Sequence, residues 1–371
     1  KIWRNYKTMR SIRNIISLRE ISRKEKNLKG KVALVRVDFN VPIRGNKVLD
    51  ATRINVAYPT LRLLLKKGME KIIILSHHSD PKQSLAPVRK ILAKNFSPAR
   101  VHLLENLRMG PGEEKNDLNF AKKLAKLGDI YINETFPDSH RAHASIVSLP
   151  KLLPAYAGLR LEAEVKNLSH VFKNPPRPFL FILGGAKFST KLPLIKKFTR
   201  KADKIFIGGA LANNFFKEMG MNIGKSLADR KKYGLKKLAR NPKIILPEDV
   251  VVSVGRKQKT KTADKVLKNE IISDIGPKAT ATLFALVRRA RFILWNGPLG
   301  KYEFGYGGAT EKIWKAAIKS RARIVIGGGD TLAALSNKNH KLPTRIFISN
   351  GGGAMLEFLA KGTLPGLRAL K

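Results

Sequence analysis

Residues 179–187 read FLFILGGAK, a run of five apolar residues that ends in two glycines. A short apolar run with no polar residue inside it is typical of a strand buried on both faces of a parallel sheet. The pattern of a buried strand followed by glycines recurs in the second half of the chain: Lys204–Ile207 before Gly208-Gly209-Ala210, Arg323–Ile326 before Gly327-Gly328-Gly329-Asp330-Thr331, and Arg345–Ile348 before Ser349-Asn350-Gly351-Gly352-Gly353-Ala354. Because a helical stretch follows each loop, these segments predict strand–turn–helix units.

Short strands and amphipathic helices alternate along the rest of the chain as well. Further strands are expected at Val32–Val37, Lys71–Leu75, Val101–Leu104, Gly128–Ile132, Ile244–Leu246 and Phe292–Leu294. Helices are expected at Ile54–Leu65 and Asn119–Leu127. This alternation predicts an α/β fold with parallel sheets flanked by helices, in which ligands bind beyond the carboxyl ends of the strands.

The chain is long for a single hydrophobic core, and its 371 residues predict about two domains. Leu161–Phe172 is expected to form a helix, which the proline-rich stretch Asn174-Pro175-Pro176-Arg177-Pro178 ends. We place the connection between the domains there.

The chain is strongly basic, with 73 Lys and Arg against 27 Asp and Glu and a formal net charge of +46. Such a charge attracts polyanions without sequence preference. The basic residues are spread over the whole chain, and aromatic residues make up only 7% of it, so we expect an adapted surface and only incidental nucleic-acid binding. The absence of cysteine rules out disulfides and thiol catalysis. No apolar run reaches the roughly 18 residues of a membrane span, and we expect a cytoplasmic protein.

The N-terminal segment is basic and carries no acidic residue before Glu20. Such a start can resemble an organelle transit peptide, but in a chain this basic it agrees with the general composition. Met9 is a candidate start, which would make residues 1–8 an upstream extension.

The four glycine loops predict a phosphate site. Glycine lets backbone N–H groups approach an anion, and the N-terminus of the following helix adds positive charge. Neither a Walker A loop nor a GxGxxG spacing is present, which favours a site built by several loops. Lys187 and Lys191 add positive charge beside the first loop. Asp330 would repel a phosphate unless a cation such as Mg²⁺ lay between them, and the alternative role for this residue is a helix N-cap.

Basic side chains stand at strand ends and in loops of the first half, where guanidinium groups suit phosphate and carboxylate ligands. The candidates are Arg36, Arg53, His77, Arg108, His140, Arg141 and His143. Any one of these histidines is also compatible with an ordinary hydrogen-bonded or surface residue, and their spacing does not indicate a metal site. The two halves together predict a site for nucleotide phosphates in the C-terminal half and a site for a small anionic substrate in the N-terminal half, an arrangement that suits a kinase.

A series of runs resembles, in order and at similar spacing, those of the phosphoglycerate kinase family, from about Met9 to the C-terminus. They are RVDFNVP (36–42), ENLR (105–108), PGEEKND (111–117), HRAHAS (140–145), LGGAK (183–187), IGGALAN (207–213), NIGKSL (222–227), DIGP (274–277), WNGPLG (295–300), GGGDT (327–331) and SNGGGA (349–354).

The resemblance implies two Rossmann-like lobes joined by a hinge helix. The expected parts are an N-terminal substrate-binding lobe of residues 1–158, an interdomain helix of residues 159–174, a C-terminal nucleotide-binding lobe of residues 175–357, and a segment of residues 358–371 that returns to the first lobe. The implied reaction is reversible phosphoryl transfer between 1,3-bisphosphoglycerate and ADP, giving 3-phosphoglycerate and ATP in glycolysis, with Mg²⁺ bound to the nucleotide. We expect a monomer.

By the same resemblance, the substrate pocket is expected to contain Arg36, Asp38, Asn40, Arg53, His77, Arg108, His140 and Arg141. Arg53 resembles the family's catalytic arginine and Lys187 the lysine that accompanies the transferred group, with Gly328 and Gly351 as backbone donors. The nucleotide site is expected to contain Gly185, Lys187, Lys191, Gly208, Gly209, Asn296, Glu303, Gly327, Gly328, Gly329, Asp330 and Thr331. Within it, Asp330 resembles the Mg-nucleotide ligand and Glu303 the glutamate that binds ribose.

The chain departs from the family pattern mainly on the substrate side. Asp80 stands where the family usually has an arginine, and Pro137-Asp138-Ser139 replaces a Gly-Thr-Ala-like stretch. Thr190 stands where Asp is usual, and Asn350 where Thr is usual. The leading prediction is an active kinase with weakened affinity for its triose substrate. The alternatives are a catalytically weakened or inactive kinase scaffold that binds nucleotide or polyanions, and a kinase for a different small acid.

Overall fold

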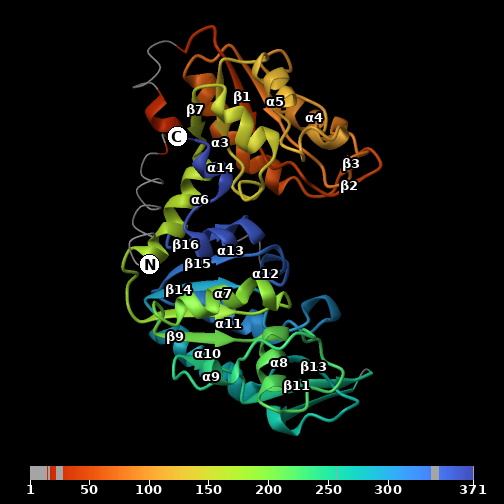
Figure 1. Cartoon of the computed structure of the whole chain (residues 1–371), viewed down its shortest axis with the longest axis vertical. Helices are drawn as coiled ribbons and strands as arrows, with labels where there is room; N and C mark the ends of the chain where they lie inside the picture. The colour runs from red at the N-terminus through yellow and green to blue at the C-terminus, as the bar shows by residue number, and fades with distance from the viewer. Residues whose placement is uncertain (1–14, 16, 22–27, 256, 336–341, 371) are drawn as a thin grey trace. The chain divides into compact units, whose positions relative to one another are not determined.

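The computed structural model describes residues 15, 17–21, 28–255, 257–335 and 342–370. The possible upstream extension, residues 1–8, lies outside the described residues. The chain divides into two compact units, residues 1–166 with 361–371 and residues 167–360. The boundary falls within helix α6 (Leu159–Ser169), which a 3₁₀ turn (His170–Phe172) follows (Figure 1).

The first unit is built on a parallel five-stranded sheet with the strand order β5-β4-β1-β6-β7. Its core joins the sheet to helix α3 through buried residues such as Val35, Ile74, Ile54 and Leu61. The strands are β1 (Val32–Arg36), β4 (Lys71–Leu75), β5 (Val101–Leu103), β6 (Ile130–Asn133) and β7 (Ala155–Ala157), beside a small hairpin of β2 (Ile43–Arg44) and β3 (Lys47–Val48). The helices are α3 (Thr52–Lys66), α4 (Ala86–Ala93), α5 (Leu118–Ala125) and, from the C-terminus, α14 (Pro365–Arg368).

Helix α14 packs on the loop that follows β6. The Gly366 amide donates to the Ser139 carbonyl over 2.8 Å. A side chain at Gly366 would collide with Ile146 and Ser139, because a Cβ there would lie 2.8 Å from Ile146 Cγ2 and 3.1 Å from Ser139 Cα. The C-terminal residues therefore form part of the first unit.

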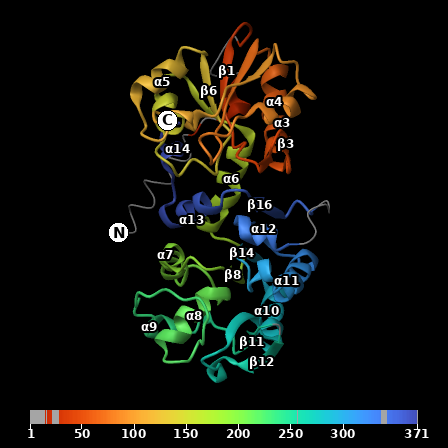
Figure 2. The ribbon, with the colours of Figure 1, turned by 90° about the vertical axis from the view of Figure 1, so that its right-hand side faces the viewer.

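The second unit is built on a parallel six-stranded sheet with the strand order β10-β9-β8-β14-β15-β16, and Figure 2 shows helices along it. The strands are β8 (Phe179–Leu183), β9 (Lys204–Ile207), β10 (Ile244–Ile245), β14 (Phe292–Asn296), β15 (Arg323–Gly327) and β16 (Ile346–Ser349). The helices are α7 (Phe188–Phe198), α8 (Gly209–Glu218), α9 (Lys236–Ala239), α10 (Pro277–Arg289), α11 (Gly308–Lys319), α12 (Gly329–Ala333) and α13 (Gly352–Lys361). Each of the four glycine loops therefore leads from a strand of this sheet into a helix, as predicted.

The parallel α/β architecture is confirmed, and the expected strands and helices lie within about two residues of the observed ones. A three-stranded antiparallel sheet was not expected. It has the order β12-β11-β13 and consists of β11 (Asp249–Val254), β12 (Lys257–Thr262) and β13 (Ile271–Ile275). Strand β12 reads KQKTKT and is almost entirely exposed, so it carries no apolar signal.

The antiparallel sheet is fixed to the rest of the second unit at the start of helix α10. The carboxylate of Asp249 accepts hydrogen bonds from the amides of Lys278 and Ala279 over 3.0 and 2.8 Å. A carboxylate at this position satisfies free N–H groups of the first helical turn and faces the positive end of the helix dipole. No helix in the described part of the chain is long and apolar enough to cross a membrane.

Candidate functional site

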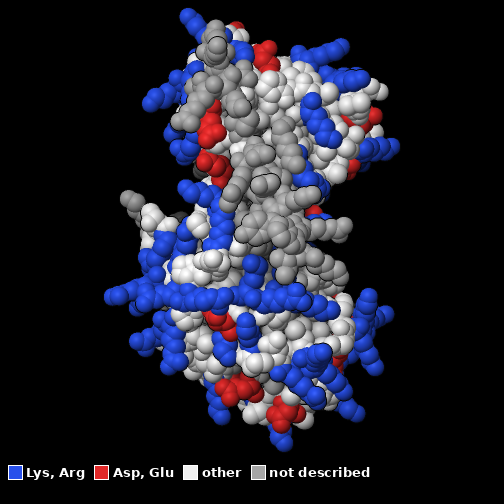
Figure 3. All heavy atoms as spheres, turned by 60° about the vertical axis from the view of Figure 1, so that its left-hand side comes forward, with Lys and Arg blue, Asp and Glu red and all other residues white. Residues whose placement is uncertain are grey.

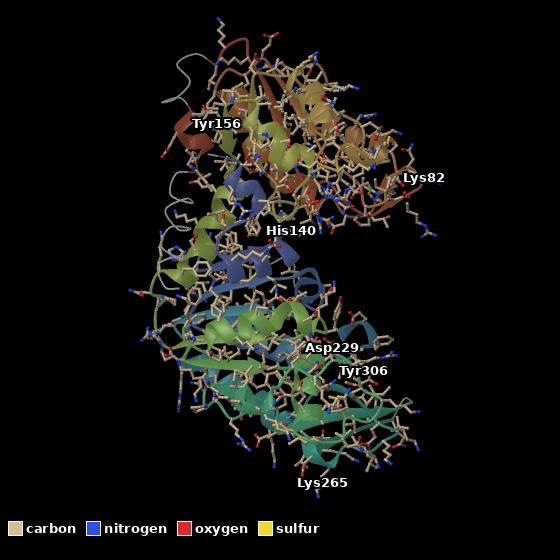
Figure 4. The ribbon with its side chains drawn as sticks, in the orientation of Figure 1. Lys82, His140, Tyr156, Asp229, Lys265 and Tyr306 are labelled. Carbon is tan, nitrogen blue, oxygen red and sulfur yellow. The ribbon has the colours of Figure 1, made fainter. Side chains whose placement is uncertain are left out.

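Three loops of the first unit meet at one edge of its sheet. Strand β1 lies between β4 and β6, and all three run parallel, so the residues that follow them emerge side by side. Asp38 and Asn40 follow β1, His77 follows β4, and His140 and Arg141 lie in the loop after β6. The fold therefore brings together most of the predicted substrate residues, and Figure 4 marks the loop after β6 at His140.

The guanidinium of Arg36 is fully buried and held by protein groups. Its Nε donates to Ser145 Oγ over 2.8 Å, and Nη1 donates to the Val37 carbonyl. Nη1 lies 3.3 Å from Asp138 Oδ2, and Nη2 lies 3.8 Å from Glu113 Oε1. Arg36 is thus held within the protein, where two carboxylates balance its charge.

Asp138 lies in the middle of this cluster and alters its charge. Burial by itself would raise the pKa of Asp138, but the charge of Arg36 outweighs that effect and holds the pKa at about 2. Burial lowers the pKa of His77 to about 3, despite the charge of Asp138. His77 is therefore neutral, and its Nδ1 accepts from Arg36 Nη2 over 3.1 Å. Sequence reasoning noted Asp138 only as a departure from the family pattern, without a role.

Arg53 lies at the first turn of helix α3 and contacts the loop after β1. Its Nη1 lies 2.8 Å from Asp38 Oδ2, while 44% of the Arg53 side chain stays exposed. Burial and the charge of Asp138 raise the pKa of Asp38 to about 6, although the charge of Arg53 opposes the shift. Asp38 thus orients Arg53 without enclosing it, so the guanidinium keeps donors free for a ligand.

Arg108 is the most distinctive basic group among the predicted substrate residues. Its side chain is only 7% exposed. Its Nε lies 3.2 Å from Glu114 Oε1 in an ion pair, whereas its Nη2 has no hydrogen-bond partner among the described residues. Burial and the charge of the nearby Arg141 lower the pKa of Arg108. Buried N–H groups without partners are costly, and an anion bound between Arg108 and Arg141 would satisfy them.

The loop after β4 contains Asp80 in place of the family's arginine. The Asp80 carboxylate accepts from the amide of Lys82 over 2.9 Å, which is a local turn. The Asn106 side chain donates to the carbonyls of Asp80, Pro81 and Gln83 and so shapes the loop. Lys82 is exposed at the outer edge of the first unit (Figure 4). Asn40 joins this loop to the one after β1, because its Oδ1 accepts from the Ser79 amide over 3.0 Å.

The glycine loops of the second unit pack backbone against backbone. The Gly184 amide donates to the Asn296 carbonyl over 2.9 Å, and the Gly185 amide to the Pro298 carbonyl over 2.8 Å. A Cβ at Gly184 would lie 2.0 Å from the Pro298 carbonyl oxygen, and one at Gly209 would lie 2.8 Å from the Gly185 amide nitrogen. Glycine is therefore required here by close approach, in addition to the positive φ of Gly209 (58°).

Asn296 and Thr331 hold these loops in place. Asn296 Nδ2 donates to the Gly327 carbonyl over 2.9 Å, and Thr331 Oγ1 accepts from the Gly297 amide over 2.7 Å. Thr331 also donates to the Gly327 carbonyl over 3.0 Å. Both side chains are buried, and their described contacts join the loop after β14 to the loop after β15.

Lys191 is buried beneath the first glycine loop. Its Nζ donates to the Gly184 carbonyl over 2.5 Å. Burial lowers the pKa of Lys191 to about 8, with Asp330 opposing the shift and Lys187 adding to it. The ammonium therefore loses its proton as the pH rises through about 8.

If nucleotide phosphates lie at Lys191, as the sequence predicts, the affinity for MgADP should fall above about pH 8, because the phosphates then lose the charge of Lys191. We expect the MgADP affinity of the wild type to fall by up to tenfold per pH unit. The Lys191→Met variant should bind MgADP weakly at every pH, with no such decline. Calorimetric titration with MgADP between pH 6.5 and 9.5 measures the affinities of the wild type and of the variant. Lys187→Met, at an exposed position, should keep the decline but move it to higher pH, because the charge of Lys187 contributes to the lowered pKa of Lys191. Equal pH profiles in the wild type and Lys191→Met would contradict the assignment.

A cavity of about 310 Å³ opens beside the glycine loops within the second unit. Four predicted nucleotide residues line it, namely Gly185, Gly209, Glu303 and Asp330. The opposite wall is mostly apolar and includes Phe216, Val250 and Phe304, which suits the flat face of a base. Val250 comes from the unexpected antiparallel sheet, so sequence reasoning missed this wall.

The remaining predicted nucleotide residues are not among those that line this cavity. Lys187 is exposed at the start of helix α7, and Gly208, Gly327, Gly328 and Gly329 lie at the carboxyl ends of β9 and β15. Gly351 is buried before α13, where its carbonyl accepts from the Met355 amide over 2.7 Å. Among the described residues, no group of three or more His, Asp and Glu side chains forms a metal cage.

The comparisons with known proteins agree over nearly the whole chain. A family model described as Phosphoglycerate kinase matches residues 23–97 and 89–362. The chain is 40% identical over 383 residues to the phosphoglycerate kinase of Thermus thermophilus, which covers 92% of this chain and 97% of that protein. It is 39% identical over 388 residues to that of Caulobacter vibrioides, covering 93% and 98%.

Solved structures give the same result. The phosphoglycerate kinase structure from Coxiella burnetii superposes with a TM-score of 0.83 at 34% sequence identity, covering 96% of this chain and 98% of that one. The structure from Pyrococcus horikoshii superposes with a TM-score of 0.81 at 26% identity, with the same coverage. The likeness in sequence and fold extends over nearly the whole chain. This chain therefore has the activity of the family, which is a step of glycolysis. The chain therefore belongs to the phosphoglycerate kinase family and is a phosphotransferase with a carboxyl group as acceptor.

Proposed function

We propose that the chain transfers a phosphoryl group reversibly between 1,3-bisphosphoglycerate and ADP, with the triose acid on the first unit and the nucleotide on the second. The observation that carries the proposal is the buried guanidinium of Arg108, whose Nη2 lacks a hydrogen-bond partner among the described residues. A phosphate or carboxylate is the ligand that such a group accepts best. The exposed Arg141 and Arg53 supply further charge within the same unit.

We assign the triose-acid groups to two roles. Arg53, Arg108, His140 and Arg141 contact the acid, because each offers donors toward solvent or lacks a partner. The Nδ1–H of His140 donates to the Pro137 carbonyl over 2.8 Å, which leaves Nε2 for the ligand. Four other predicted residues position the site through contacts already made within the protein: Arg36, Asp38, Asn40 and His77.

We assign the nucleotide to the cavity beside the glycine loops. The base lies on the apolar wall and the ribose near Glu303, with the phosphates at the loops and at Lys187 and Lys191. Mg²⁺ fits this arrangement, since it binds in proteins through one or two carboxylates together with substrate phosphates, and Asp330 is a carboxylate on the cavity wall. The ion would neutralise phosphate charge there.

The chemistry needs no covalent intermediate with the protein. A β-phosphate oxygen of ADP bonds to the phosphorus of the acyl phosphate while the bond from phosphorus to the carboxyl oxygen breaks, which leaves a carboxylate. Arg53 and Lys187 neutralise the oxygens of the group in transfer, and the glycine amides orient the nucleotide. Because each substrate is assigned to its own unit, transfer requires the two units to bring the substrates together.

Separate binding measurements test this assignment. In calorimetric titrations of the full chain, Arg108→Ala should abolish detectable 3-phosphoglycerate binding and leave MgADP affinity unchanged. Glu303→Ala should abolish detectable MgADP binding and leave the affinity for 3-phosphoglycerate unchanged. If either variant lost both ligands equally while keeping its thermal midpoint, the division of the substrates between the units would be wrong.

Asp138 should weaken the triose-acid site, because it adds a carboxylate beside the arginines. Two like unit charges roughly 10 Å apart repel each other by roughly 1.7 kcal/mol at an effective dielectric constant of about 20, which is the scale of the effect to be expected here. We therefore expect Asp138→Asn to bind 3-phosphoglycerate roughly 15- to 20-fold more tightly. The amide oxygen can still accept from Thr135, whose hydroxyl lies 2.9 Å from Asp138 Oδ2.

Calorimetric titration of 3-phosphoglycerate into Asp138→Asn checks this expectation. Asp117→Asn, at the exposed N-cap of helix α5, is the control with the same charge change in the same unit. Unchanged or weaker binding by Asp138→Asn, at an unchanged thermal midpoint, would show that Asp138 does not oppose the substrate.

The proposal also includes a monomeric enzyme of the cytoplasm. All residues assigned to the two sites belong to one chain, so no second copy is needed to complete either of them. Light scattering of the full chain at micromolar concentration tests the oligomeric state, with the 41.3 kDa mass of one chain as the expected result.

A further inference from the structure

The second unit has a second hollow on its surface, with a volume of about 650 Å³. Eleven residues line it, of which seven are Lys or Arg and none is Asp or Glu. The seven cations are Arg288, Arg289, Arg291, Lys312, Lys315, Lys319 and Arg321. We call this hollow the basic groove.

The basic groove lies on the opposite edge of the sheet from the nucleotide cavity. Arg291 directly precedes β14, and Arg321 lies two residues before β15, whereas the glycine loops follow the carboxyl ends of these strands. The two strands pair in parallel register, with Phe292 opposite Arg323, so their amino ends lie together. The basic groove is therefore a separate site from the nucleotide cavity.

The walls of the groove come from helices α10 and α11. Lys312, Lys315 and Lys319 stand three and four residues apart, on one face of α11. Phe284 and Arg288 stand four apart on α10. The buried faces of both helices pack on the sheet through other residues, such as Leu283 and Ile313, so the basic face is not needed for the core.

Stabilisation by helix dipoles explains the positions of only some of these seven cations. Arg288, Arg289 and Lys319 lie in the last turns of their helices, where cations are stabilising. Lys312 and Lys315 lie earlier in α11, and Arg291 and Arg321 lie beyond the helix ends. In the described part of the chain, Lys315 alone among the seven has an ion-pair partner, Glu311 at 2.7 Å. The remaining positive charge is uncompensated within the groove.

We propose that the basic groove binds a short segment of single-stranded nucleic acid. A single strand is bound by a positively charged groove that follows its phosphates, combined with aromatic side chains on which bases stack. The groove supplies the charge, and Phe284 supplies an aromatic ring on its wall, with 42% of the side chain exposed. The four arginines add planar guanidinium groups, which grip phosphates and stack on bases.

The rest of the surface supports encounter with such a strand but does not define the site. The face of the second unit drawn in Figure 3 shows many more Lys and Arg than Asp and Glu. A net charge of +46 raises the rate of encounter with any polyanion and weakens binding as salt rises. Binding in the groove goes beyond this general attraction, because it depends on particular cations and on one aromatic ring.

A labelled ten-nucleotide oligouridylate tests the proposal by fluorescence anisotropy, with the full chain saturated by MgADP so that the nucleotide cavity is occupied. The groove variant reverses three exposed cations (Arg288→Glu, Lys319→Glu and Arg321→Glu). The matched control reverses three exposed cations of α9 and the residue after it (Lys236→Glu, Lys237→Glu and Arg240→Glu), so both change the net charge by six. We expect at least a tenfold loss of affinity in the groove variant and less than a threefold loss in the control.

Phe284→Ala separates base stacking from phosphate binding. It should weaken oligouridylate binding about tenfold and leave the binding of inorganic polyphosphate unchanged. The slope of log affinity against log salt should be smaller in the groove variant, by about 0.7 for each phosphate that the variant no longer neutralises. Unchanged kinase turnover in all three variants confirms that they fold.

Two results would overturn the proposal. Equal losses in the groove variant and the α9 control would show that only the general charge acts. Polyphosphate binding as tight as oligouridylate binding, with no effect of Phe284→Ala on either, would show a phosphate site that does not recognise nucleic acid.

Discussion

The Arg53→Ala variant should turn over at least about a thousandfold more slowly than the wild type, with unchanged affinity for MgADP. An arginine that neutralises charge on a phosphoryl group in transfer contributes on the order of a thousandfold or more. Arg53 is suited to this role because Asp38 fixes one of its nitrogens at 2.8 Å while much of the side chain stays exposed. The group is thus oriented before a ligand binds.

Steady-state kinetics together with calorimetric titration of MgADP measure this effect. Arg62→Ala is the matched control, since Arg62 is exposed on the same helix and its guanidinium lies over the Tyr58 ring, 5.8 Å from the ring centroid. Turnover of the control should stay within about twofold of the wild type. If Arg53→Ala kept more than a tenth of wild-type turnover, the catalytic assignment of Arg53 would fail.

The Gly184→Ala variant should lose at least about a hundredfold in affinity for MgADP. Its new Cβ would lie 2.0 Å from the Pro298 carbonyl oxygen and 2.8 Å from that of Gly297. Both contacts are with backbone, so the loops after β8 and β14 must move apart. That movement would break the hydrogen bonds from Gly184 and Gly185 that hold the two loops together and displace the amides that orient phosphate.

Gly308→Ala controls for the loss of a glycine in the same unit, because a Cβ there would meet no atom within 4 Å. It should bind MgADP as the wild type does. Binding of 3-phosphoglycerate by Gly184→Ala should persist, which would show that the first unit is intact. Wild-type MgADP affinity in Gly184→Ala would contradict the close packing of these loops.

Sequence patterns predicted those parts of the fold whose local chemistry is unambiguous. Apolar runs such as Phe179–Leu183 can be satisfied only by strands buried on both faces, and the glycines after them end the strands where helices begin. Strand β12 could not be found in this way. Its side chains alternate Lys with Gln and Thr and are almost all exposed, and its pairing with β11 depends on contacts formed only in the folded chain.

The sequence predicted which types of residue form the candidate site. It could not predict which of their charges neutralise one another within the folded protein. Arg36 and Asp138 are distant in the sequence, and only the fold places Nη1 and Oδ2 3.3 Å apart. The sequence therefore could not reveal that Arg36 is neutralised within the protein, nor that Arg108 is buried with one nitrogen, Nη2, that has no hydrogen-bond partner among the described residues. The lowered pKa of Lys191 likewise results from burial, which no local pattern encodes.

The most direct test of this account is a coupled assay of the purified full chain for 1,3-bisphosphoglycerate formation from ATP and 3-phosphoglycerate, with 3-phosphoglycerate at millimolar concentration. We predict Mg²⁺-dependent turnover, an elevated KM for 3-phosphoglycerate, and a lower KM in Asp138→Asn. The absence of turnover at saturating 3-phosphoglycerate, in protein that still binds MgADP, would contradict the account and indicate an inactive kinase scaffold.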